Sequence, residues 1–315
     1  MKVVFFALLM SLLLWAGAAK AQSCTATPTD IAFGSVSPIS GAAISGSSTV
    51  AVNCTWPLIS AQPFVQVCLN LNASSPRLLS NGSNTMQYDL YLDSAHSQSW
   101  GASATAISLS IPKPLLGTTA GQSVTYYGLI GANQLTVPSV ANSNTVYSQS
   151  FSGTQTSLTY QFYTLSAPSC SSISTPATAF PFNATATVVN NCNISAGKLS
   201  FGTAGVLSSG LSATSTLSVQ CTNGDAYRIS LNGGGSGNVA ARTMQRQGGG
   251  GSVNYQLYTD LANTVAWGDG SGGTSRATNT GTGNTQAITV YGNVPAQTTP
   301  MPGNYSDTIT ATIEF

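Results

Sequence analysis

One order of landmark residues occurs twice along this chain of 315 residues, and it restricts the fold more than any other feature. In each copy a cysteine, Cys24 or Cys192, stands nine residues before a Phe-Gly pair, and a Cys-Thr pair follows at Cys54 or Cys221. Rare residues in the same order at near-equal spacing predict two related domains. The later landmarks are a Tyr-x-Leu-Tyr run at 88–91 and 255–258, a Trp-Gly pair at 100 and 267, a Tyr-Gly pair at 127 and 291, and a Tyr-Ser pair at 147 and 305.

Short stretches of alternating apolar residues recur through both copies, whereas no long stretch has a helical period. Clear examples are residues 65–71, 216–221 and 308–315, with glycine- and serine-rich pieces between such stretches. Alternation of this kind is typical of half-buried β-strands. We therefore predict an all-β protein with two immunoglobulin-like β-sandwich domains in tandem, over residues 22–190 and 191–315.

Residues 1–21 have the pattern of a secretory signal peptide. Lys2 precedes an almost wholly apolar run from residue 3 to 16, and Ala-Lys-Ala at 19–21 fits a cleavage site. A membrane anchor is the alternative, but the run is shorter than the roughly 20 residues that a membrane span needs. We expect an exported protein.

The six cysteines favour disulfides over a metal site. Their number is even, the chain is expected to be exported, no C-x-x-C pair occurs, and the chain has one histidine. Equivalent cysteines of the two copies should pair equivalently, which leaves one further pair. The predicted disulfides are Cys24–Cys54, Cys192–Cys221 and Cys68–Cys170, and neither a metal nor a cofactor is expected.

Charged side chains are sparse, and their distribution excludes two functional classes. Without the expected signal peptide the chain carries seven basic and eight acidic residues. No basic patch is present, so nucleic-acid binding is not expected. We also expect no enzyme: His96 is the single histidine, and no nucleophile-elbow pattern occurs. Asp93 and Asp260 are equivalent in the two copies, which favours structural hydrogen bonds over paired acid–base chemistry.

The landmarks of the second copy carry a family resemblance. They include Arg242-Thr-Met244, Trp267-Gly-Asp-Gly270 and Gly303-Asn-Tyr-Ser-Asp307, while the first copy has Arg77-Leu-Leu79 in place of Arg-x-Met. At these positions the chain resembles the spore coat protein U domain family, which includes subunits of archaic (Csu-type) chaperone–usher pili, among them a two-domain tip adhesin. The resemblance implies subunits that lack a final strand, which the next subunit supplies from an N-terminal extension.

A stretch that resembles such a donor strand lies between the two copies. Its apolar residues alternate as a buried strand requires. We expect the strand, near 177–190, to complete the first domain of the same chain. A plain linker is the alternative, but a linker would not be expected to alternate. The apolar positions are Phe182, Ala184, Ala186 and Val188.

The resemblance also predicts a place in the polymer. After signal cleavage Gln22 and Ser23 would precede the first copy, too few for a donor extension, and the second copy runs to Phe315 in its last family strand. The chain would then accept a strand from an adjacent pilin subunit and donate none. We expect a tip subunit that a periplasmic chaperone and an outer-membrane usher deliver to the cell surface. The alternative is a secreted coat protein or a shaft subunit of the same family.

Apolar loops in the first copy suggest what such a tip would contact. The first copy has about seven more residues between Cys54 and Asn72 than the second copy has between Cys221 and Asn232. Clustered apolar loops on an exported protein favour adhesion to abiotic or host surfaces and biofilm formation. The alternatives are that the loops pack over the sandwich end, or that Trp56 stacks on a sugar ring. The predicted binding residues are Trp56, Pro57, Leu58, Ile59, Phe64, Ile111, Pro112, Pro114, Leu115 and Leu116, with a further loop at Leu135, Val137 and Pro138.

Overall fold

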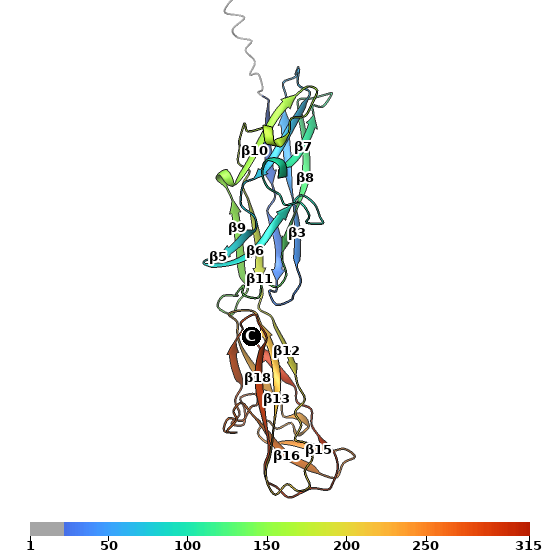
Figure 1. Ribbon diagram of the computed structural model, residues 1–315, viewed down its shortest axis with the longest axis vertical. Helices are drawn as coiled ribbons and strands as arrows, with labels where there is room; N and C mark the ends of the chain where they lie inside the picture. The colour runs from blue at the N-terminus through green and yellow to red at the C-terminus, as the bar shows by residue number, and fades with distance from the viewer. Residues whose placement is uncertain (1–21) are drawn as a thin grey trace, which may run out of the picture. The chain divides into compact units, whose positions relative to one another are not determined.

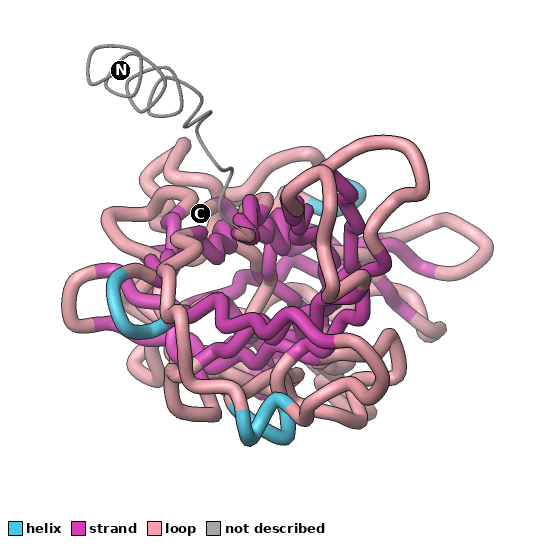
Figure 2. The backbone as a smooth tube through the Cα atoms, turned by 90° about the horizontal axis from the view of Figure 1, so that it is seen from above, coloured by secondary structure: helices cyan, strands magenta, loops and turns pink. Residues whose placement is uncertain are grey.

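The computed structural model describes residues 22–315, so the predicted signal peptide lies outside the described residues. The described elements are β-strands and four short 3-10 turns (Figures 1 and 2), which confirms the predicted all-β class. The chain forms two compact units. Unit 1 comprises the residues up to Gly34, Ala43–Gly131 and Tyr147–Ala186, and unit 2 comprises Ser35–Ala42, Ala132–Val146 and Thr187–Phe315.

Two sheets form the first sandwich. The larger has the strand order β1-β3-β8-β6-β5-β9-β11-β2, and the smaller has the order β10-β4-β7. The strands of the larger sheet are β1 (Ser23–Pro28), β2 (Ile31–Val36), β3 (Ile44–Thr55), β5 (Arg77–Asn81), β6 (Asn84–Tyr91), β8 (Thr119–Ile130), β9 (Thr145–Phe151) and β11 (Phe182–Val188). Those of the smaller sheet are β4 (Phe64–Leu71), β7 (Ile107–Pro112) and β10 (Thr156–Tyr163), and the 3-10 turns are η1 (Ser103–Thr105), η2 (Gly153–Gln155) and η3 (Cys170–Ser172).

The second sandwich repeats this plan with fewer strands. Its sheets have the orders β12-β13-β18-β16-β15-β19 and β17-β14-β20. The strands are β12 (Cys192–Ala196), β13 (Leu211–Cys221), β14 (Ala226–Leu231), β15 (Arg242–Arg246), β16 (Ser252–Tyr258), β17 (Ala277–Thr280), β18 (Gln286–Val294), β19 (Tyr305–Ser306) and β20 (Ala311–Glu314), with η4 at Gly234–Ser236.

The core of each unit is built around the equivalent tryptophan. Trp100 is fully buried and its indole N–H donates to the Leu69 carbonyl over 2.9 Å. Trp267 is also fully buried and donates to the Ile229 carbonyl over the same distance. A buried indole N–H needs a hydrogen-bond acceptor, and both copies provide one on a strand of the smaller sheet. The matched Trp-Gly pairs of the sequence are therefore structural.

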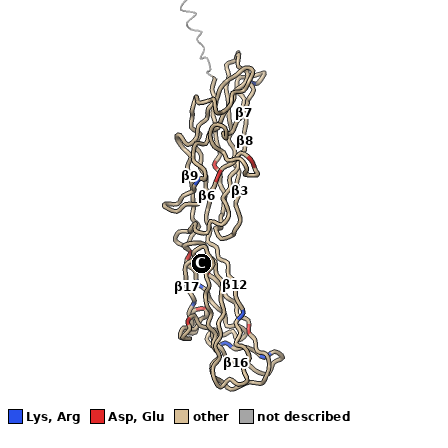
Figure 3. The backbone as a smooth tube through the Cα atoms, in the orientation of Figure 1, with Lys and Arg blue, Asp and Glu red and all other residues tan. Residues whose placement is uncertain are grey.

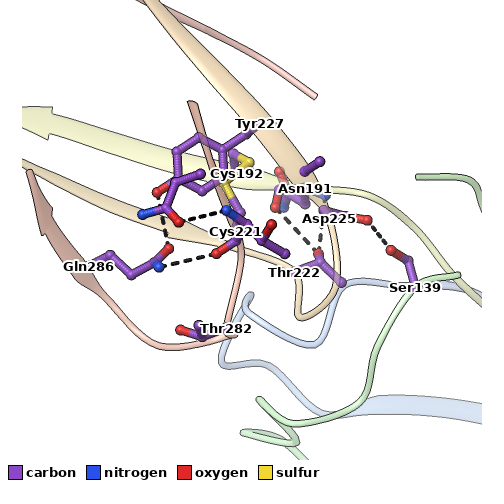
Figure 4. The surroundings of a disulfide bond; sticks show 12 residues. Ser139, Asn191, Cys192, Cys221, Thr222, Asp225, Tyr227, Thr282 and Gln286 are labelled. Carbon is purple, nitrogen blue, oxygen red and sulfur yellow. Dashed lines mark hydrogen bonds between the residues drawn. A yellow bond between two sulfur atoms is a disulfide. The ribbon is translucent and has the colours of Figure 1, made fainter. Parts of the chain in front are cut away.

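The three disulfides have the predicted pairing, and the described residues include no free cysteine. Cys24 is paired with Cys54 in the register of β1 and β3, and Cys192 with Cys221 in the register of β12 and β13. Figure 4 shows the second of these disulfides with the polar groups around it. The third, Cys68–Cys170, joins β4 to the segment that follows β10 and spans 102 residues of sequence.

Candidate functional site

Unit 2 contains a groove of about 1040 Å³ whose lining is partly apolar and partly polar. Two chain segments, 196–205 and 299–309, contribute to its lining together with the inner faces of the strands. A groove of this size, lined largely by apolar side chains and backbone, suits an extended peptide better than a small polar ligand. Apolar side chains that line it include Leu199, Phe201, Met244, Tyr255, Leu257 and Ile309.

The same place in unit 1 is filled by a strand. β11 lies between β9 and β2 in the larger sheet. The equivalent segments of unit 2, 199–204 and 303–309, contain no strand except the two residues of β19. Because strand structure depends on hydrogen bonds with a neighbour, both segments lack the partner that β11 provides in unit 1. The groove therefore lies where a strand equivalent to β11 would run.

Burial differs between the two units in the same way. Five apolar residues of β2, β5 and β9 are fully or almost fully buried, while their counterparts around the groove are only partly buried. An added strand would cover the apolar surface that these counterparts leave exposed. Covering it would stabilise unit 2 by roughly 25 cal/mol of free energy per Å² of apolar surface. The pairs are Ile31 and Leu199, Phe33 and Phe201, Leu79 and Met244, Tyr147 and Tyr305, and Phe151 and Ile309.

β11 has the side-chain pattern predicted from the sequence. Phe182, Ala184, Ala186 and Val188 are all buried, at 2% exposure or less. The Phe182 ring stacks on Phe151 with centroids 4.5 Å apart and lies parallel to Trp100 at 5.9 Å. The stretch is therefore a core strand in the larger sheet of the first sandwich, and the alternative of a plain linker is wrong.

Charges are sparse around the groove, as they are along the whole described chain (Figure 3). Lys198 and Asp307 contribute to its lining. The Asp307 carboxylate accepts hydrogen bonds from the Tyr255 hydroxyl over 2.7 Å and from the Gly235 N–H over 2.8 Å. Burial, with the hydrogen bond to Asp307, raises the pKa of Tyr255, so the phenol stays protonated at neutral pH.

A second candidate site is a set of exposed apolar loops at one end of unit 1. Leu58, Ile59, Leu115 and Leu116 are between 76% and 102% exposed. Hydrogen bonds hold their loops together: the Lys113 ammonium donates to the Leu58 carbonyl over 3.1 Å. Residues 56–63 and 113–118 therefore form one surface, which we call the apolar loop end.

A third loop, 164–169, belongs to the apolar loop end and was missed in the sequence. Leu165 is 96% exposed. The Thr164 hydroxyl donates to the Ala61 carbonyl over 3.2 Å, which joins this loop to the first. The signal was present, because Leu165 and Pro168 repeat the apolar and proline content of the other two loops.

Trp56 and Ile111 are not part of the exposed surface. Both side chains are buried, and the Trp56 ring packs edge-on against Phe162 at 5.5 Å. The physical reason is strand alternation, since Trp56 continues the inward series of Val52 and Cys54 beyond the end of β3. The prediction of exposure is therefore wrong for both residues, and Trp56 offers no face to a sugar.

The remaining predicted binding residues lie in varied environments. Pro112 is exposed, and Pro57 and Pro114 are half-buried at the apolar loop end. Phe64 is 37% exposed and stacks on Tyr163.

The loop at residues 132–146 is not part of the apolar loop end, because it belongs to unit 2. Val137 is buried, Leu135 and Pro138 are half-buried, and the Leu135 carbonyl packs directly against Gly283. Leu135, Val137 and Pro138 therefore do not form a third loop of this surface.

The carboxylates of Asp93 and Asp260 have the structural role expected from their equivalence. Each accepts hydrogen bonds from backbone N–H groups four and five residues further along the chain. These bonds lower the pKa of both carboxyl groups. Within residues 22–315 no three metal-binding side chains come together, and no helix is long and apolar enough to cross a membrane.

Comparisons with known proteins agree with this architecture. Protein U of Myxococcus xanthus is 35% identical over 149 residues, which is 42% of this chain and 82% of that protein. In the chaperone–tip adhesion subunit pre-assembly complex of the archaic Csu pili of Acinetobacter baumannii, one chain matches with a TM-score of 0.50. It has 19% identity and covers 93% of this chain and 100% of that one, a likeness of fold. The Spore Coat Protein U domain model matches residues 10–148 and 178–312, and the chain belongs to this family.

Proposed function

We propose that the protein is the tip adhesin subunit of an archaic chaperone–usher pilus. The observation that carries this proposal is the difference between the two units. The first sandwich already contains β11, whose buried apolar residues have the pattern of a donor strand, whereas unit 2 has a groove where such a strand would lie. The described chain can thus take a strand from a neighbour but has no second strand of this kind to give.

In this proposal the groove has successive occupants. A periplasmic chaperone covers the apolar surface after export, and at the outer-membrane usher the donor strand of the adjacent pilin replaces it. Unsatisfied strand edges promote aggregation, so an open groove requires such a partner before assembly. The solved complex with similar fold is described as a chaperone with a tip adhesion subunit, which supports the proposal.

The apolar loop end would be the adhesive surface, displayed at the pilus tip. It carries Leu58, Ile59, Leu115, Leu116 and Leu165 on three loops joined by hydrogen bonds. Exposed clusters of large apolar side chains on a protein of this kind mark interaction sites. Its chemistry fits an apolar abiotic or host surface, with attachment and biofilm formation as the result.

The proposal is tested by thermal unfolding of residues 22–315, alone and with a peptide that copies residues 177–190. Because a ligand of the native state stabilises it, we expect the peptide to raise the melting temperature of unit 2 only. The control peptide carries aspartate at the positions of Phe182 and Ala184 and should have no effect. If the first peptide shifts neither transition, the groove accepts no strand, and a coat protein that does not polymerise becomes the better reading.

A further inference from the structure

The two units carry opposite charges at the same point of the fold. Asp30 lies six residues after Cys24 and three before Phe33. Lys198 lies six residues after Cys192 and three before Phe201. No gap is needed to align the two segments, so an acidic residue of unit 1 corresponds to a basic residue of unit 2.

Backbone hydrogen bonds show that this correspondence is structural. The Thr29 N–H donates to the Thr49 carbonyl over 2.8 Å, and the Gly197 N–H donates to the Thr216 carbonyl over 2.9 Å. Both donors immediately precede the charged residue.

Two equivalent serines, Ser48 and Ser215, also form the same hydrogen bond in both units. The Ser48 hydroxyl donates to the Thr29 carbonyl over 2.9 Å, and the Ser215 hydroxyl donates to the Gly197 carbonyl over 2.7 Å. The backbones that carry Asp30 and Lys198 therefore have the same local structure.

In unit 1 this charge holds the inserted strand. The Asp30 carboxylate accepts the Asn183 backbone N–H over 2.7 Å and the Asn183 side-chain amide over 3.1 Å. Asn183 directly follows Phe182, the large anchor of β11. Asp30 thus binds the residue next to the anchor. Both hydrogen bonds are accepted by a carboxylate, so they are of the stronger, charge-assisted kind.

In unit 2 the corresponding residue, Lys198, has the opposite charge and can only donate hydrogen bonds. Lys198 is exposed, lines the groove and forms no ion pair with the described residues. The other charge in the groove lining, Asp307, is already engaged by Tyr255 and Gly235. An ammonium group cannot accept the hydrogen bonds that Asp30 accepts, so a strand with asparagine at this position would leave Lys198 without a partner.

We infer that unit 2 selects a donor strand with an acidic side chain directly after the anchor that corresponds to Phe182, through an ion pair with Lys198. The inference rests on the proposed function and specifies the chemistry of the adjacent subunit. The anchor itself remains large: Phe182 packs on Tyr126 and Phe151, whose counterparts Val290 and Ile309 are smaller and leave room for an aromatic ring.

The test uses three peptides that copy residues 177–190, with aspartate, asparagine or lysine at the position of Asn183. Their affinities for residues 22–315 are measured at low salt by fluorescence anisotropy after full equilibration. Exposed ion pairs are worth little, so we expect the aspartate peptide to bind about threefold tighter than the asparagine peptide, with the lysine peptide weakest. The difference should shrink at high salt.

The second part of the test changes the charge of residue 198 in the protein. Lys198→Glu should make the lysine peptide the tightest, and Lys198→Gln should make the three peptides bind alike. The matched control Arg276→Gln removes an exposed positive charge of unit 2 outside the groove lining and should leave the order unchanged. If the wild-type protein binds all three peptides equally, the charge inference is wrong and the proposed function stands. If no peptide binds, both are wrong.

Discussion

The two units are the same sandwich in two states, one complete and one open. Both have the cysteine pair, which links β1 to β3 in unit 1 and β12 to β13 in unit 2, the buried tryptophan and the same sheet plan. They differ where β11 lies in unit 1 and where the groove lies in unit 2. The comparison teaches that the last strand does not define the fold: it covers a core which the other strands have already arranged.

The buried arginines provide a second, finer comparison. In unit 1 Arg77 forms an ion pair with Asp89. In unit 2 the equivalent Arg242 is fully buried, and its hydrogen-bond acceptors are neutral: the Gln256 side chain and the carbonyls of Leu231 and Asn232. Burial lowers the pKa of both guanidinium groups, that of Arg77 to about 10, so both stay charged at neutral pH.

The largest effect is expected from removal of the anchor of β11. Phe182→Ala removes a buried aromatic ring and should lower the free energy of unfolding of unit 1 by about 3 to 5 kcal/mol. Phe201→Ala in unit 2 removes a ring that the open groove leaves partly exposed, so the loss should be smaller. Chemical denaturation of the two variants measures both values. Equal losses would contradict the contrast between a complete and an open core.

The arginine comparison predicts the next effect. Asp89→Ala would leave Arg77 buried without its counter-charge and should cost unit 1 about 3 to 5 kcal/mol. Gln256→Ala removes one neutral acceptor from Arg242, so unit 2 should lose only about 1 to 3 kcal/mol. Denaturation curves of the two variants compare these losses. A greater loss for Gln256→Ala would show that the ion pair is not the stronger partner.

A change at the apolar loop end should affect adhesion and not stability. The double variant Leu115→Ser and Leu116→Ser alters exposed side chains, so the unfolding free energy should stay within about 0.5 kcal/mol of the wild-type value. Attachment to polystyrene beads should fall clearly. Leu261→Ser is the matched control, because Leu261 is an exposed leucine of unit 2. Unchanged attachment of the double variant would remove the adhesive role from these leucines.

The smallest effect concerns a buried carboxyl group of unit 2. Asp225 is buried and accepts a hydrogen bond from the Ser139 hydroxyl (Figure 4), and burial raises its pKa. The folded state therefore binds the proton more tightly than the unfolded state, so its stabilising contribution is present at acidic pH and is lost as the pH rises above about 4. Asp225→Asn should weaken this pH dependence in melting curves between pH 3 and 7. If the melting temperature of the variant depends on pH as that of the wild type does, groups other than Asp225 cause the dependence.

Much of this arrangement could be predicted because the chain contains its own comparison. The repeat fixed the pairing of Cys24 with Cys54, and the alternation of Phe182 and Val188 gave the position of β11. Trp56 was misjudged because inward alternation continues beyond the end of a strand, which composition does not reveal. The environment of Val137 could not be predicted either, since it depends on packing between segments far apart in the sequence.

In the proposed tip adhesin, the Cys68–Cys170 disulfide would have a mechanical consequence. Three residues, 189–191, separate β11 from β12, so force applied to β12 passes along the backbone to β11. If β11 were pulled from its sheet, the chain could extend only as far back as Cys170. The 18 residues from 171 to 188 would release at most about 60 Å. Loss of β11 would thus lengthen the molecule by a limited amount, because the disulfide then passes the load to β4.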